Sequence, residues 1–333
     1  MLKVGILGAG FMGSTHARAF AKQMDTQIVA ISSRSPEKAT ALAQEVGAEA
    51  TTDHLALATD PRVDVISNTL PTHLHQELTV AALNAGKHVF LEKPMGLSVA
   101  ECEVMIAAAQ QNGRLLMLAH VLRFWPEYVA LVEFVKSGAL GRSLSATAKR
   151  LSARPTWGDW FANPECTGGA VLDLQVHDLD MLNWLFGTPQ TVYARGQKGR
   201  FGGWDHTLTL LDYGEVKAFA EGTILMPAGY PFTMTLAVLC ENGSVEYNFR
   251  ASGPGVASGT APGTSLMVYE AGKEPRALTS TPSNGYENQV AAFIECVRTN
   301  RLPDRATAED GRLAVQTALA ARQSLETGEV VRL

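Results

Sequence analysis

The sequence has few cysteines and no excess of positive charge. Charged side chains account for 18% of its 333 residues and the formal net charge is −5, which argues against nucleic acid or an acidic membrane surface as the main partner. The cysteines form no C-x-x-C pair, so we expect reduced and mostly structural thiols. The four cysteines lie far apart in the chain, at Cys102, Cys166, Cys240 and Cys296.

Long hydrophobic runs are missing as well. No apolar stretch approaches the about 20 residues that cross a bilayer. A strand-like run begins almost at once, with no charged and then apolar segment of a signal peptide before it. We therefore expect a cytoplasmic protein whose partners include neither nucleic acid nor membrane. With 46% hydrophobic residues, the chain has ample material for a core and is long enough for two domains.

A glycine-spaced turn follows the first apolar run. Gly8, Gly10 and Gly13 form the pattern G-x-G-x-x-G of dinucleotide-binding units. The first glycine lets the chain turn sharply, the second lets the backbone approach a pyrophosphate, and the third lets the helix pack on its strand. The phosphates would bind at the helix N-terminus, where N–H groups and the helix dipole favour anions. Phe11 and Met12 complete the predicted phosphate-binding turn.

The segment after this turn indicates which dinucleotide binds. Residues 14–24 have helical apolar spacing and residues 27–32 form a second buried strand, which completes a βαβ unit. NAD sites have an acidic residue about twenty positions past the glycines. Here that position is Ser33, followed by Arg34 and then by Lys38 one helical turn further on. Hydroxyl and guanidinium groups suit the 2′-phosphate of NADP, so the segment favours NADP over NAD.

The same segment can be interpreted as an ordinary helix start. Ser35 suits the N-cap and Pro36 the first helical position. A helix start and a phosphate contact are compatible, so both interpretations stay open.

Strand-like and helical segments alternate through the first third of the chain. This alternation predicts an α/β fold with a doubly wound parallel sheet, a Rossmann domain over residues 1–120. Longer β-like runs separated by Gly and Asn turns follow, and they predict an α+β domain with a largely antiparallel sheet over residues 121–333. The C-terminal helices near 286–299 and 307–327 are assigned to this second domain, with packing back onto the first as an alternative.

A short sequence in the second domain matches a glycosylation sequon. It consists of Asn242, Gly243 and Ser244. In a cytoplasmic chain it is better interpreted as an Asn-Gly hairpin turn between the β-type runs 233–240 and 245–249.

Glu92, Lys93 and Pro94 directly follow the strand-like residues 87–91. Ligands of doubly wound sheets bind at the carboxyl ends of the strands, so Lys93 is expected to project towards the cofactor. Pro94 has no N–H and restricts the residue before it to extended geometry, which fixes where the lysine points. An ordinary exposed loop lysine is the alternative.

Two glycines, at 168 and 169, precede a helical stretch that contains Asp173 and His177. Their i, i+4 spacing puts both side chains on one face, with Asp180 on about the same face. A histidine beside a carboxylate can act as general acid and base near neutral pH. The alternatives are a helix-dipole acid beside an incidental histidine, or a zinc pair. Two ligands without a third and fourth make no zinc site, so we predict no metal.

A third group of candidates follows the strand-like residues 115–119. His120 and Arg123 combine an imidazole and a cation suited to lining a polar substrate site near nicotinamide. For the neighbouring aromatic residues Phe124 and Trp125 we favour packing at the domain junction.

Taken in order, these motifs resemble the glucose–fructose oxidoreductase/inositol dehydrogenase (Gfo/Idh/MocA) family. The resemblance rests on the glycine turn, on Glu92-Lys93-Pro94 and on Gly168-Gly169 with Asp173 and His177; residues 69–75 also look like the family's loop after the fourth strand. It covers essentially the whole chain. It implies a nicotinamide-dependent oxidoreductase of sugars, inositols or related polyols. It also implies an open, mostly antiparallel sheet in the second domain that often builds dimers or tetramers, so a homodimer or homotetramer is expected.

The resemblance also implies roles for single residues. Lys93 matches a lysine that contacts nicotinamide and the reacting oxygen, Asp173 a substrate-site acid, and His177 the general acid/base. Hydride transfer from a carbinol needs a base for the hydroxyl proton, and a cation stabilises the developing alkoxide. Further implied positions are Thr69, Pro71, His73, Glu92 and His120 on the cofactor or nicotinamide side, and Trp160 and Tyr286, which reach nicotinamide or substrate from the second domain. His120 and Arg123 stay predicted substrate-binding residues from the segment that follows residues 115–119.

Two departures and two alternatives accompany the resemblance. Ser33 and Arg34 differ from the acidic version of the inositol dehydrogenases and look like NADP-using members, and His120 stands where many relatives carry an amide. A glycoside hydrolase that works by transient oxidation with a retained cofactor is one alternative, but such members tend to be exported and longer. A non-catalytic cofactor-binding sensor is the other, and the presence of Lys93, Asp173 and His177 argues against it.

Overall fold

The computed structural model describes residues 1–154, 163–252 and 264–333. Trp160 and most of the glycine-rich segment 251–264 therefore lie outside the described residues. The chain forms two compact units, and each is treated by itself below. The first consists of Met1–Val121 and Gly285–Arg312, and the second of Leu122–Asn284 and Leu313–Leu333.

The first unit is built on a six-stranded sheet in which all neighbouring strands are parallel. Its spatial order, β3-β2-β1-β4-β5-β6, is that of the doubly wound dinucleotide-binding fold, and the winding reverses between β1 and β4. The predicted Rossmann sheet is confirmed. The strands are β1 (Leu2–Leu7), β2 (Thr26–Ser32), β3 (Glu49–Thr51), β4 (Val65–Asn68), β5 (His88–Leu91) and β6 (Leu116–Leu118).

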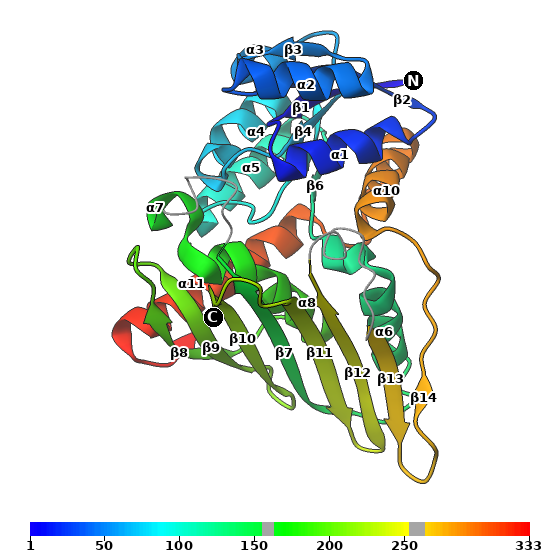
Figure 1. The fold of residues 1–333 in the computed structure, drawn as a ribbon, viewed down its shortest axis with the longest axis vertical. Helices are drawn as coiled ribbons and strands as arrows, with labels where there is room; N and C mark the ends of the chain where they lie inside the picture. The colour runs from blue at the N-terminus through cyan, green and yellow to red at the C-terminus, as the bar shows by residue number, and fades with distance from the viewer. Residues whose placement is uncertain (155–162, 253–263) are drawn as a thin grey trace. The chain divides into compact units, whose positions relative to one another are not determined.

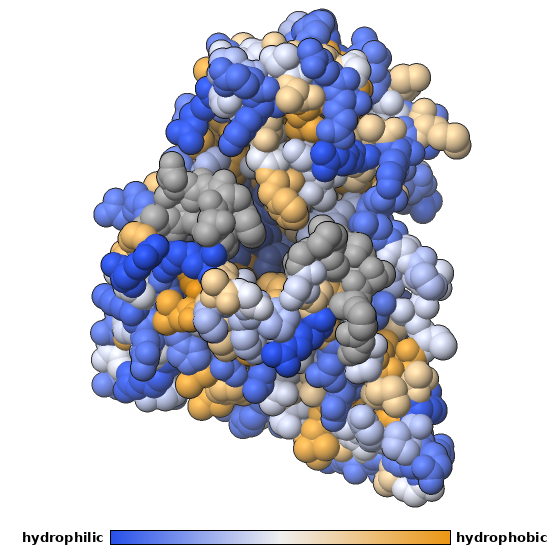
Figure 2. Space-filling view, in the orientation of Figure 1, coloured by the Kyte–Doolittle hydropathy of each residue, from blue (hydrophilic) through white to orange (hydrophobic). Residues whose placement is uncertain are grey.

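Helices cover both faces of this sheet, which is why strands such as β4 and β6 are buried at every residue. Their outward faces are polar, and Figure 2 shows hydrophilic residues over most of the visible surface of the unit. The helices are α1 (Phe11–Ala21), α2 (Pro36–Val46), α3 (His54–Ala58), α4 (His75–Asn84), α5 (Val99–Gln111) and α10 (Gly285–Thr299), with a short 3-10 turn, η1 (Thr72–Leu74).

An aromatic cluster joins α10 to the rest of this unit. The ring of Phe293 stacks on Phe90 of β5 with centroids 5.1 Å apart, and Phe20 of α1 meets both rings edge-on. The late segment Gly285–Arg312 thus completes the core of the nucleotide-binding unit (Figure 1, orange).

The second unit contains a nine-stranded sheet in the order β14-β13-β12-β11-β7-β10-β9-β8-β15 (Figure 1). Only β7 and β10 pair in parallel, so the expected mostly antiparallel sheet is confirmed. The strands are β7 (Ser143–Ala153), β8 (Thr191–Lys198), β9 (Trp204–Asp212), β10 (Lys217–Met226), β11 (Phe232–Cys240), β12 (Gly243–Ala251), β13 (Ser265–Glu270), β14 (Arg276–Ala277) and β15 (Val331–Arg332).

The hairpin between β11 and β12 forms one residue earlier than expected. Cys240 pairs with Gly243, so the two loop residues are Glu241 and Asn242. Gly243 instead begins β12, where a Cβ would lie 2.0 Å from the carbonyl oxygen of Tyr269. The glycine is required by this close approach of β13 and not by the turn itself.

Helices pack on one face of the nine-stranded sheet. Gln175 binds that face twice, donating to the carbonyl oxygen of Ala220 and accepting from Thr209 Oγ1. Along β9 and β11, buried residues of this face alternate with more exposed residues of the other. No helix in the described ranges is long and apolar enough to span a bilayer. The helical elements here are η2 (Val121–Phe124), α6 (Pro126–Lys136), α7 (Pro164–Thr167), η4 (Val171–Gln175), α8 (Val176–Phe186) and α11 (Ala308–Thr327).

Candidate functional site

The glycine turn lies at the carboxyl end of β1, where the winding of the first sheet reverses. Gly8 has a φ of +104°, and a Cβ there would lie 2.7 Å from Thr69 Oγ1. A Cβ on Gly13 would lie 2.1 Å from the Gly8 carbonyl oxygen, whereas a Cβ on Gly10 would meet nothing within 4 Å. Two glycines therefore allow tight packing, and the third leaves the open approach that a pyrophosphate needs.

Helix α1 begins at this opening. Its N-cap, Gly10, contributes no capping side chain, and no acidic residue stands in the first turn. The N-terminal N–H groups and the helix dipole therefore face no protein carboxylate from this turn, which suits an anionic ligand. The residues present fit the phosphates of a dinucleotide.

The end of β2 carries positive charge at the surface. Arg34 and Lys38 are exposed, and Ser33 is half-buried. Ser35 caps α2 by accepting the N–H of Lys38, which confirms the helix-start interpretation, and the phosphate contact of this segment stays a prediction. The nearby His54 has its pKa lowered, mainly by burial and also by the charge of Arg34.

The loop after β4 is fixed by its own hydrogen bonds. Thr69 Oγ1 donates to the Leu7 carbonyl oxygen at 2.7 Å, which ties this loop to the glycine turn. Pro71 is half-buried and His73 is exposed. In the buried ring of His75, Nε2 lies 2.8 Å from the Leu70 carbonyl oxygen and Nδ1 lies 2.9 Å from the Pro94 carbonyl oxygen, which brings this loop against the segment after β5.

Lys93 follows β5 at the carboxyl edge of the same sheet and is half-buried. Its peptide bond to Pro94 is cis. The preceding Glu92 is buried, donates its N–H to Asn68 on β4, and accepts the N–H of Lys93 at Oε2 (3.0 Å). Burial alone would raise the pKa of Glu92, but the imidazole of His16 and the charge of Lys93 hold it below its usual range.

His120 and Arg123 both follow β6 and are both buried. His120 belongs to the first unit and Arg123 to the second. The guanidinium of Arg123 donates to both carboxylate oxygens of Asp180 at 2.9 Å. A bidentate partner of this kind anchors the arginine, and its predicted contact with substrate stays a prediction.

Asp173 and His177 lie on a helical segment with an uneven turn. Val171–Gln175 is π-helical and α8 begins at Val176, so the pair spans a wider turn than the regular α-helical turn expected. Such wide turns occur frequently at functional sites. Both side chains are half-buried, in contrast to their buried neighbours Asp178 and Asp180. They are thus the accessible polar groups of this segment.

Two buried ion pairs hold α8 in place. Arg150 of β7 donates to both carboxylate oxygens of Asp178 at 2.8 and 3.0 Å, and Arg123 does the same for Asp180. Burial raises the pKa of Asp178, and the guanidinium opposes that effect. Because both pairs are bidentate, they fix the rotation of α8 and its position along its axis, and His177 lies in the first turn of this helix.

Two family models match this chain. One, described as an oxidoreductase family with an NAD-binding Rossmann fold, covers residues 2–120, and the other, the GFO/IDH/MocA C-terminal domain, covers residues 128–246. The chain belongs to the Gfo/Idh/MocA family. It is an oxidoreductase of the sugar and inositol dehydrogenase type that uses a nicotinamide cofactor.

Relatives of this oxidoreductase match over their full length. A 1,5-anhydro-D-fructose reductase of Ensifer adhaerens is 29% identical, with 100% of this chain and 99% of the relative covered. A myo-inositol 2-dehydrogenase of Thermotoga maritima is 27% identical, with 100% and 98% covered. The structure of an aldose-aldose oxidoreductase from Caulobacter crescentus, complexed with glycerol, is 25% identical with a TM-score of 0.86 and covers 100% of this chain and 99% of its own.

The predicted site residues of this family member divide between the two units. The first unit holds the glycine turn, Thr69, Lys93 and also Tyr286, which the resemblance had placed in the second domain; Tyr286 is half-buried at the start of α10. The second unit holds Asp173 and His177. In the described ranges, no cluster of three or more His, Cys, Asp or Glu side chains could hold a metal ion.

Sequence reasoning missed several residues that support the site. His16, beside Glu92, carried a usable signal, since it lies on the buried face of the helix that the glycine turn opens. The pairing of Arg150 with Asp178 left no signal in the sequence, because the two residues stand 28 positions apart in different elements.

Proposed function

We propose that this enzyme transfers hydride between NADP and a carbinol or carbonyl carbon of a sugar, inositol or related polyol. The observation that carries the proposal is the order of strand ends in the first sheet. Gly8 follows β1, Thr69 follows β4 and Lys93 follows β5, and these three strands are neighbours. Lys93 therefore stands two strands, or roughly 10 Å, along the sheet edge from the phosphate cradle. That is the nicotinamide side of a dinucleotide held by the glycine turn.

Bound nicotinamide supplies the hydride acceptor or donor. His177 takes the hydroxyl proton when a carbinol is oxidised and returns it in the opposite direction. Lys93 stabilises the negative charge that develops on the reacting oxygen, and Asp173 orients a substrate hydroxyl. The half-buried state of Asp173 and His177 supports these roles, because a substrate can reach half-buried side chains, whereas Asp178 and Asp180 beside them are buried.

The catalytic roles are tested with a panel of inositols and aldoses, following the absorbance of reduced nicotinamide. Lys93→Ala is expected to lower kcat by about a hundredfold or more while the cofactor Kd stays within about threefold. Lys3→Ala, an exposed lysine at the amino end of β1, is the matched control and should behave as wild type. Wild-type turnover in Lys93→Ala would exclude the role of this lysine.

The same panel separates the alternative functions. Glycoside cleavage without net change in reduced nicotinamide would identify a hydrolase. Cofactor binding without turnover of any panel member would identify a sensor. Net reduction or oxidation with at least one polyol supports the dehydrogenase.

The choice of NADP rests on Ser33, Arg34 and Lys38 at the end of β2. Arg34→Asp removes a guanidinium that would pair with the 2′-phosphate, so the ratio of kcat/KM for NADP over NAD should fall by about ten- to a hundredfold. Arg114→Asp makes the same charge change at the amino edge of the same sheet, where Arg114 lies beside His88, and should leave the ratio unchanged. A wild-type enzyme that already prefers NAD would overturn the choice of NADP.

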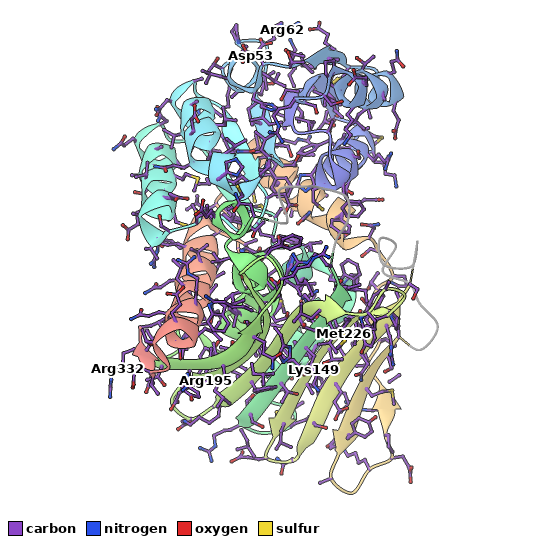
Figure 3. The ribbon with its side chains drawn as sticks, turned by 60° about the vertical axis from the view of Figure 1, so that its left-hand side comes forward. Asp53, Arg62, Lys149, Arg195, Met226 and Arg332 are labelled. Atoms are coloured by element: carbon purple, nitrogen blue, oxygen red, sulfur yellow. The ribbon has the colours of Figure 1, made fainter. Side chains whose placement is uncertain are left out.

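We also propose that the enzyme forms homo-oligomers through the face of the nine-stranded sheet opposite its helices. Leu210 and Leu239 on this face are 52% and 49% exposed. The strand register aligns Arg195, Leu208, Glu221 and Lys149 in a further row of charged and apolar residues, of which Lys149 and Arg195 are labelled in Figure 3. The row through Leu210 includes the neighbours Tyr193, Leu210, Phe219, Thr147 and Ala237, which are mostly apolar, and continues to Glu246 and Met267.

A second copy of the chain suits this face, because a two-fold axis would place the row through Leu210 against itself. Leu210→Asp is expected to lower the molar mass measured by light scattering after size exclusion. Leu302→Asp changes an 84% exposed leucine of the first unit and is the control. An unchanged mass in Leu210→Asp would exclude this face as the interface.

A cytoplasmic location is proposed with the same enzyme. Its support is that all four cysteines are free, with Cys102 and Cys240 buried, as in proteins of reducing compartments.

A further inference from the structure

His16 is a fully buried histidine in the nucleotide-binding unit. It stands on α1 three residues after Gly13, and its ring stacks on Phe90 with centroids 5.0 Å apart. Its Nδ1 is hydrogen-bonded to Ser67 Oγ on β4 at 2.9 Å. Its Nε2 lies 3.0 Å from Oε1 of Glu92. A buried imidazole needs polar partners, and here Nδ1 has a hydrogen bond to Ser67 while Nε2 has a close contact with the Glu92 carboxylate.

Glu92 connects this histidine to Lys93. Its carboxylate is buried, with one oxygen towards His16 and the other accepting the backbone N–H of Lys93. The contacts Ser67–His16–Glu92–Lys93 therefore form a continuous chain within one unit. The low pKa of Glu92 agrees with a carboxylate that keeps its charge in this place.

We propose that His16 is a positioning residue for Lys93, acting through Glu92. The inference rests on the proposed function, in which Lys93 acts on the reacting oxygen. A buried carboxylate that loses its partner must take up a proton or move, and either change releases the hydrogen bond to the Lys93 N–H. Because α1 also begins at the phosphate cradle, the same helix supports both the pyrophosphate and the lysine.

Residues of α4 and α10 also contact the segment that contains Glu92 and Lys93. From α4, Nδ1 of His75 lies 2.9 Å from the carbonyl oxygen of Pro94, the residue after Lys93. From α10, Phe293 closes the aromatic stack against Phe90. Two histidines therefore contact the residues next to Lys93, with His16 at Glu92 and His75 at Pro94.

Two amide substitutions distinguish the contacts of His16. In His16→Gln the amide nitrogen can take the place of Nε2 and keep the close contact with Glu92, whereas in His16→Asn it can replace Nδ1 only. We expect His16→Asn to lower kcat by about ten- to a hundredfold, as a displacement of about 1 Å does, with the NADPH Kd within about threefold of wild type. His16→Gln should restore most of the loss. If the asparagine variant fails to fold, Glu92→Gln replaces it and is expected to lower kcat to the same extent.

A double-mutant cycle separates positioning from a purely structural role. If His16 acts through Lys93, His16→Asn has no further effect on kcat in the Lys93→Ala background. An equal loss in both backgrounds, or wild-type kcat in His16→Asn, overturns the proposal.

A second readout does not depend on turnover. Hydrogen exchange of the Lys93 amide in the cofactor-free protein should be faster in His16→Asn than in His16→Gln, because only the former loses the support of Glu92. Unchanged exchange overturns the proposal whatever the kinetics show. If exchange accelerates but Lys93→Ala turns over at the wild-type rate, the proposed function fails and the link from His16 to Lys93 stands.

Discussion

The three glycines of the phosphate turn are expected to respond differently to the same added methyl group. In Gly13→Ala the new Cβ would lie 2.1 Å from the Gly8 carbonyl oxygen, so the helix and strand must separate by about 1 Å. Such overpacking costs about 3 kcal/mol, and the better helix propensity of alanine returns about 1 kcal/mol. The free energy of unfolding should therefore fall by about 2 kcal/mol.

Gly10→Ala should show the opposite behaviour. The residue has a φ of −84° and a Cβ there meets nothing within 4 Å, so the free energy of unfolding should change by less than about 1 kcal/mol. The methyl group would, however, occupy the space of the pyrophosphate and raise the cofactor Kd at least about tenfold, or about 1.4 kcal/mol.

Urea unfolding of the cofactor-free protein and a fluorescence titration with NADPH measure the two quantities separately. Equal stability losses in the two variants would refute the packing account of Gly13. A wild-type cofactor Kd in Gly10→Ala would refute the assignment of the phosphate site.

Two further predictions concern buried charges. Asp178→Ala leaves the guanidinium of Arg150 buried without its partner and should lower the free energy of unfolding by about 3–5 kcal/mol. The double variant Asp178→Leu with Arg150→Met should recover most of that loss. A loss below about 1 kcal/mol in Asp178→Ala would contradict this account. The pKa of Glu92 is lower in the folded protein than in the unfolded chain, so its stabilisation is complete above the unfolded value of about 4.3 and is lost as the pH falls through the folded value. Unfolding measured between pH 7 and pH 3 should therefore show a shallower acid decline in Glu92→Gln than in wild type.

Local sequence patterns were sufficient for the parts of the fold that depend on neighbours in the chain. The G-x-G-x-x-G turn needs only the close packing of one strand and one helix, and Ser35 and Pro36 marked a helix start that the structure confirms. The hairpin at Gly243 was found but displaced by one residue, because the glycine serves a close contact with β13 and not the turn.

The supports of the site could not be deduced in this way. Arg123 and Asp180 are 57 residues apart, and Arg150 and Asp178 are 28 apart, so their pairing depends on the tertiary fold. The π-helical turn before α8 likewise leaves no mark in apolar periodicity. Lys93 was predictable because it follows a recognisable strand. The contacts that support it join three elements of the fold, so local patterns did not indicate them.

The position of Phe293 has a consequence for the order in which the protein is made. Its ring completes the stack on Phe90, yet a ribosome translates β7 to β14, eight strands of the nine-stranded sheet, between these two residues. The nascent nucleotide-binding unit must therefore wait, with one side of its aromatic core open to solvent, until residue 293 has emerged. A fragment that stops at Val121 contains every strand of the parallel sheet but not the helix that closes its core, so it should bind chaperones and aggregate more readily than the full chain.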